Sequence, residues 1–202
     1  MSTPFNPSTK IKKILGESAV IIFSVLLALF ANEWRSNVKE ARKTQVILDN
    51  IELEMKDNQR IADTAFAYHK SVFGRIQEML DTDSLQQLFN GYYFDDYQFA
   101  PKGIMREGFN NIAWIVAKEE RIATRIGFQQ SEALYEAYKQ QETVEETLKK
   151  ISQLLFDRTT HRQASTQENI ILLALLFNEL TSQEEELQLK YKQAREIITA
   201  AK

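Results

Sequence analysis

Cysteine is absent from this chain of 202 residues, which excludes disulfide bonds, thiolate metal sites and cysteine nucleophiles. Proline and glycine are scarce, at 3 and 6 residues, and no proline lies between Pro7 and Pro101. Proline removes a backbone donor and its ring clashes with the preceding helical turn, whereas glycine weakens helices through its conformational freedom. Their scarcity therefore favours helix over most of the chain.

A large excess of either charge is also absent. The net charge is −3, and the basic residues are interleaved with acidic ones. Proteins that bind nucleic acid gather lysine and arginine on one surface, so we expect no nucleic-acid partner. The hydrophobic content of 44% is sufficient for a packed core, which excludes a chain disordered throughout.

Motifs for catalysis are missing too. The two histidines, His69 and His161, are far apart in sequence, and neither has a glutamate three residues before it. That spacing is typical of metal sites in helical bundles. The chain has neither a glycine-rich phosphate loop nor a Gly-x-Ser-x-Gly elbow. We therefore expect a protein that is not an enzyme and that holds no metal or cofactor.

One long apolar run is present, AVIIFSVLLALFA at residues 19–31. Extended to residues 14–34 it would form a helix of about 30 Å, the thickness of the hydrocarbon layer of a bilayer. A basic tail at residues 1–13 and Trp34 would lie at its two edges. A cleaved signal peptide or a buried soluble helix would also fit the run, but Leu29 stands where signal cleavage after Ala31 needs a small residue. We predict an uncleaved transmembrane helix at 14–34, followed by a helical domain at 35–202.

One face of the predicted span carries small residues at helical spacing. The stripe that we predict for anchoring and helix association consists of Glu17, Ser24, Ala28, Ala31 and Trp34. Small residues four apart allow two span helices to approach closely, although they are also common in spans that remain alone. The carboxyl group of Glu17 either extends to the headgroups or faces protein. Lysine and arginine flank both ends of the span, so our expectation that the body lies outside the cytoplasm has little support from the positive-inside rule.

The beginning of the chain resembles a widespread bacterial family of short single-span membrane proteins, which is classified only as a domain of unknown function. The matching residues are Gly16-Glu17, an aliphatic stretch, Ser24, Leu26, Ala28-Leu29, Asn32 and Trp34. The family usually has glycine where Ser24 stands, so the position stays small. A weaker similarity extends to Ala113-Trp114 and Leu134-Tyr135…Tyr138. The resemblance implies a membrane-tethered helical protein, most simply in the bacterial inner membrane, without an assigned activity.

Beyond the span, apolar or small residues recur in steps of three, four or seven, which predicts one helical face. These seam positions are Trp34, Val38, Ala41, Leu48, Ile51, Met55, Ala62, Ala65, Val72, Ile76 and Met79. Three polar residues, Gln45, Asn58 and His69, occupy the missing places of the seam. We therefore predict that the span continues into one helix that ends near Asp81.

The rest of the chain predicts further helices. One is expected from about Phe109 to Glu120, with a short piece at 121–126, and a long helix should be capped by Ser131. A last helix follows the capping box that begins at Ser165. Its seam is Ile170, Leu173, Phe177, Leu180, Leu187, Tyr191, Ala194 and Ile198, with Glu184 in the one gap. The predicted fold is all-α, a transmembrane helix that runs into an extended antiparallel helical bundle with one short aromatic loop or hairpin.

That aromatic segment is YYFDDYQFAPKG at residues 92–103. Two interpretations are open: its rings cover the end of the bundle, or they form an exposed patch for a ligand or partner. The candidate patch consists of Tyr92, Tyr93, Phe94, Tyr97 and Phe99.

These features predict a membrane-anchored interaction or scaffolding module, single-pass, whose partners are the lipid bilayer and a second copy or another protein. The alternative is a membrane-tethered, sensor-like bundle that binds a small ligand of unknown identity.

Overall fold

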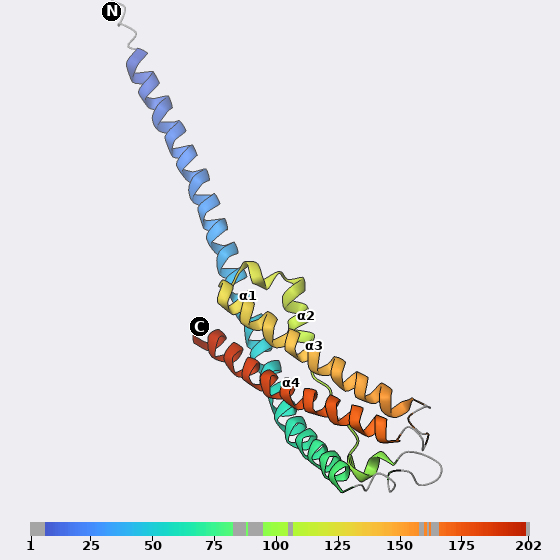
Figure 1. Cartoon of the computed structure of the whole chain (residues 1–202). Coiled ribbons are helices and arrows are strands. Elements are labelled where there is room, and N and C mark those ends of the chain that lie inside the picture. Colours follow the sequence, from blue (N-terminus) through green and yellow to red (C-terminus); the bar gives the residue numbers. More distant parts are fainter. Residues whose placement is uncertain are drawn as a thin grey trace, which may run out of the picture. The chain divides into compact units, whose positions relative to one another are not determined.

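The computed structural model describes residues 7–82, 88, 95–104, 107–157, 160, 162 and 166–200, with side chains from residue 15 onward. These residues form helices and turns and contain no strand. The elements in chain order are α1 (Pro7–Asp81), η2 (Asp96–Gln98), α2 (Ile112–Glu119), η3 (Ile122–Thr124), α3 (Phe128–Phe156) and α4 (Thr166–Ala200). The predicted all-α class is therefore confirmed, and Figure 1 shows α1 as the longest element.

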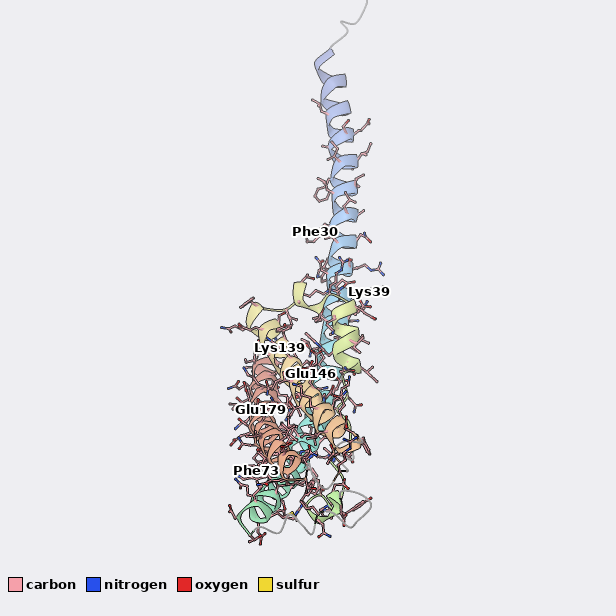
Figure 2. All side chains as sticks on the ribbon, turned by 45° about the vertical axis from the view of Figure 1, so that its right-hand side comes forward. Phe30, Lys39, Phe73, Lys139, Glu146 and Glu179 are labelled. Carbon is pink, nitrogen blue, oxygen red and sulfur yellow. The ribbon has the colours of Figure 1, made fainter. Side chains whose placement is uncertain are left out.

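The chain divides into two units, and the boundary falls inside α1, between Val46 and Ile47. In the first unit, α1 has a stretch that is long and apolar enough to cross a membrane, and no residue of its most apolar window is buried. Phe30, for example, is 70% exposed, and its side chain projects outward from the helix (Figure 2). Water does not solvate such a surface favourably, so exposed apolar side chains of this kind favour a cover.

The second unit, residues 47–202, is a helical bundle. Figure 1 shows α3 and α4 side by side and running in opposite directions, as predicted for the last two helices. The part of α1 that belongs to this unit packs against α4: the Gln188 side chain donates to the Ala62 carbonyl over 3.4 Å, and Arg195 donates to the Gln59 side chain over 2.9 Å. Charged residues such as Lys139, Glu146 and Glu179 lie on the outside (Figure 2).

The core of the bundle follows the predicted helical faces closely. Every predicted seam position of α4, from Ile170 to Ile198, is buried, including the gap at Glu184. On α1 the seam is buried from Leu48 to Ile76, and Asn58 and His69 are buried with it. Its first positions, from Trp34 to Ala41, are exposed and belong to the first unit.

Two predicted helix boundaries are wrong. The helix expected at Phe109–Glu120 begins only at Ile112. The third helix begins at Phe128 rather than after Ser131, because the side chain of Gln130 accepts the backbone N–H of Gly127 over 3.0 Å and so stabilises an earlier start. The capping serine of the last helix, Ser165, lies outside the described residues.

Candidate functional site

A polar face of α1 holds the backbone of the segment that connects α1 to α2. The segment runs antiparallel to α1, so that later residues of α1 contact earlier residues of the segment. Arg75 donates to the Phe99 carbonyl over 2.6 Å, and the Tyr68 hydroxyl donates to the Gly103 carbonyl over 2.6 Å. The segment makes some backbone hydrogen bonds within itself, such as that from the Gly103 N–H to the Ala100 carbonyl over 2.9 Å. Side chains of α1 satisfy further backbone groups that a helix would satisfy internally.

The same arrangement continues towards α2. The Asn58 side chain donates to the Asn110 carbonyl over 2.6 Å and accepts the N–H of the same residue over 2.8 Å. One turn earlier, the Glu54 carboxylate accepts the N–H groups of Ala113 and Trp114, over 2.7 and 3.4 Å. These are first-turn amides of α2, which lack partners inside their own helix, so a carboxylate on α1 caps α2 from outside.

Asn58 and Glu54 also connect to α3 and α4. The Tyr138 hydroxyl donates to Glu54 over 2.6 Å, while Gln141 accepts hydrogen bonds from Asn58 over 3.2 Å and from the Tyr191 hydroxyl over 2.6 Å. Burial, assisted by the Glu54 carboxylate, raises the pKa of Tyr138, and burial likewise raises the pKa of Tyr191. Both phenols therefore stay neutral donors while the body is folded.

A buried ion pair or proton-sharing pair lies at the centre of this polar face. His69 Nδ1 and Glu184 Oε1 are 2.7 Å apart, and both side chains are 0% exposed. The other ring nitrogen of His69, Nε2, contacts the Ile104 carbonyl of the connecting segment. Burial raises the pKa of Glu184, and the hydrogen bond with His69 offsets part of that rise. His69 therefore joins α1, α4 and the connecting segment at one point.

A groove of about 570 Å³ lies between α1 and the connecting segment. It is lined by Arg60, Ile61, Thr64, Ala65, Ala67, Tyr68, Ser71, Lys102, Ile104 and Glu107. Arg60 is bound to Asp57 and Glu107, over 3.2 and 2.9 Å, and the Lys102 ammonium lies 6.0 Å from the centre of the Tyr68 ring. An apolar floor with a few charged groups at its edges is typical of small-ligand sites.

The predicted association stripe lies on the exposed part of α1. Glu17, Ala28 and Ala31 are exposed, and Trp34 is 65% exposed. The Ser24 hydroxyl donates to the Val20 carbonyl over 2.8 Å, so its hydrogen bond is made within its own helix.

The aromatic patch is only partly described. Tyr92, Tyr93 and Phe94 lie outside the described residues. Tyr97 is 69% exposed on η2, whereas Phe99 is fully buried in the core. Phe99 thus cannot contribute to an exposed patch, and a role for Tyr97 in binding stays a prediction. The described part of this segment forms a 3-10 turn and not a hairpin.

Sequence reasoning placed Asn58, His69 and Glu184 on seam positions but did not identify what they bind. It missed Glu54, Tyr68 and Arg75 altogether as residues that hold the connecting segment. The available signal was the polar gap itself: a polar residue in a place that periodicity marks as buried needs a buried partner. No group of three or more histidine, aspartate or glutamate residues that could hold a metal ion occurs in the described parts of the chain.

Comparison with known proteins adds no relative. No protein-family model matches the chain, and neither a curated protein nor a solved structure matches it. The resemblance of residues 16–34 to a family of single-span membrane proteins therefore stays a prediction.

Proposed function

We propose that this protein is a single-pass, membrane-anchored interaction or scaffolding module that has no enzymatic activity and associates with itself through its span. The observation that carries the proposal is the division of α1 into an apolar part exposed all round and a part buried in a helical bundle. Lipid is the cover that suits a helix apolar on every side. The bacterial inner membrane, which the family resemblance implies, and a body outside the cytoplasm are also part of the proposal.

Self-association is supported by the small residues of the stripe. The side chains of Ala28 and Ala31 are small and lie on one face of the span, and the hydroxyl of Ser24 is hydrogen-bonded within its own helix. Close backbone approach lets two helices gain dispersion contacts that larger side chains would prevent. Because the span fixes both copies in the same orientation, their bodies would lie on the same side of the membrane.

The test uses a single cysteine at Arg35→Cys, which is unique because the chain has no other. We expect Ala28→Leu to lower the yield of disulfide-linked dimer in membranes severalfold, because leucine separates the two backbones. Ala19→Leu is the matched control, since at about 100° per residue position 19 lies on the opposite face from position 28. Equal dimer yields for the two variants would remove the stripe from consideration.

The second candidate function is a sensor-like bundle that binds a small ligand, which the groove between α1 and the connecting segment favours. The groove has about the volume of small-molecule sites, and one of its walls is built from Lys102, Ile104 and Glu107 of the connecting segment. Here the span would serve only to tether the body.

A further inference from the structure

The hydrogen bonds of His69 determine how many protons the buried pair holds. The Ile104 carbonyl can only accept, so the Nε2 atom that contacts it must carry a proton. At 2.7 Å, Nδ1 and Glu184 Oε1 also need one proton between them, because two bare lone pairs would repel each other. The pair therefore holds two protons and is neutral as a whole, whether the shared proton lies on the ring or on the carboxyl group.

Loss of the shared proton would change which atom of His69 donates. The ring would then carry a single proton and face a carboxylate on one side and a carbonyl on the other. The charge-assisted hydrogen bond to the carboxylate is the stronger of the two, so the proton would move to Nδ1. Nε2 would become a bare acceptor opposite the Ile104 oxygen, and that contact would turn repulsive.

We propose that His69 and Glu184 form a proton-operated clamp, in which the shared proton keeps residues 102–104 on α1 and its loss releases them. The released segment includes Lys102 and Ile104, which form one wall of the groove. Two further bonds hold this segment, from Tyr68 to Gly103 O and from Lys102 N to the Tyr68 hydroxyl, over 2.6 and 3.1 Å. Both depend on Tyr68, the neighbour of His69 on α1, so loss of the histidine contact acts on the same short stretch.

Few of the described groups around the pair can compensate a negative charge on Glu184. Glu184 Oε2 is buried and has no hydrogen-bond partner among the described residues, so a carboxylate there lacks compensation. The Phe177 ring of α4 lies 6.0 Å from the His69 ring. On α3, the uncharged side chain of Gln140 donates to the carbonyl of Gln183, the residue before Glu184, over 3.0 Å.

Charged groups on the neighbouring elements are engaged elsewhere. On α1, the Lys70 ammonium lies 5.4 Å from the centre of the Phe66 ring, and Arg75 donates to Phe99 O. On the connecting segment, the Lys102 ammonium lies over the Tyr68 ring. The charged group that acts on Glu184 of α4 is its own partner, His69 of α1.

The direction of the pH effect follows from Glu184. Its pKa in the folded body is raised above the ordinary value of 4.5, so the folded state holds the proton more tightly than the unfolded chain. The stability that this raised pKa gives to the folded body is fully present below about pH 4.5, and it is lost as the pH rises through the pKa of Glu184 in the folded body. The clamp should thus open towards alkaline pH.

The test follows amide hydrogen exchange of residues 99–104 in the full chain in detergent micelles, with exchange times corrected for the intrinsic effect of pH. In the wild-type chain we expect protection of this segment to fall by up to about tenfold per pH unit, the slope for release of one proton. In Glu184→Gln an amide N–H would donate to Nδ1 and keep the ring proton on Nε2. Protection should then persist at alkaline pH.

The matched control is Glu186→Gln, the same change two residues along on an exposed position of α4, which should behave like the wild-type chain. Equal loss of protection in Glu184→Gln and in the wild-type chain would overturn the clamp.

A second measurement applies if Glu184→Gln does not fold. The substitution His161→Gln leaves His69 as the only histidine, and nitrogen NMR of the His69 ring then shows which ring nitrogen carries a proton. An Nε2 atom that carries a proton at low pH and lacks it at high pH supports the clamp, and an Nε2 atom that is protonated at every pH, or bare at every pH, overturns it.

Discussion

At the scale of single residues, the bundle depends on a few buried polar side chains with partners far away in sequence. Asn58 is an example, because its amide satisfies both backbone groups of Asn110 and also donates to Gln141. A buried backbone group left without a partner costs about 1–3 kcal/mol, which exceeds what an ordinary intact hydrogen bond contributes. Such residues are therefore more sensitive to substitution than their small contact area suggests.

Asn58→Leu should lower the free energy of unfolding of the body by about 1–3 kcal/mol, because leucine leaves the N–H and carbonyl of Asn110 unpaired. Trp114, whose ring is stacked on Tyr138 at a centroid distance of 4.9 Å, reports unfolding by fluorescence in a Trp34→Phe background. Asn37→Leu, the same change at an exposed position of α1, should alter stability by less than about 0.5 kcal/mol. Similar effects for both variants would contradict the role assigned to Asn58.

At the scale of elements, α4 contributes a buried face that α1 and α3 both contact. Phe177 is 0% exposed on that face, whereas Leu175, two residues earlier, is 62% exposed. The apolar run at the beginning of α4 thus contains residues with opposite environments. Which of them stabilise the bundle is decided by helical phase, since residues two apart point in different directions.

Phe177→Ala should therefore destabilise the body by about 3–5 kcal/mol, the cost of a cavity left by a buried phenyl ring. Leu175→Ala removes an apolar side chain from the same helix, but its effect should stay within about 0.5 kcal/mol because the site is solvated. Denaturant unfolding followed by Trp114 fluorescence measures both. An equally large loss at Leu175 would mean that this surface is covered in the folded protein.

At the scale of the whole molecule, the two units of the chain have opposite solvent requirements. The first exposes its apolar side chains all round, while the second buries its apolar faces internally. Among the described side chains of α1, the first buried one is that of Ile47, so the core of the bundle lies after the exposed part of the helix. The bundle should fold without the span.

We expect the full chain to sediment with membranes through a high-salt wash and to dissolve only in detergent. A fragment of residues 43–202 should remain in the supernatant after high-speed centrifugation and keep the fluorescence of folded Trp114. Full-length chain in the supernatant without detergent, with its first 34 residues intact, would contradict membrane anchoring. An insoluble or unfolded fragment would contradict the independence of the bundle.

The sequence by itself determined the helical class, the exposed apolar stretch and most of the buried positions on α1 and α4. These properties are local, because helical periodicity places residues three and four apart on one face whatever they pack against. The same reasoning failed at the beginning of α3, where Gln130 rather than Ser131 makes the stabilising contact.

Only the tertiary structure decided what the polar gaps of the seam bind. His69 and Glu184 are 115 residues apart, and Asn58 and Asn110 are 52 apart, so no local pattern connects them. Periodicity gives the face on which a side chain lies, but hydrogen bonding depends on which element reaches that face and in what register. The candidate site consists of such long-range pairs, and for that reason it emerged from the packing of α1, α4 and the connecting segment.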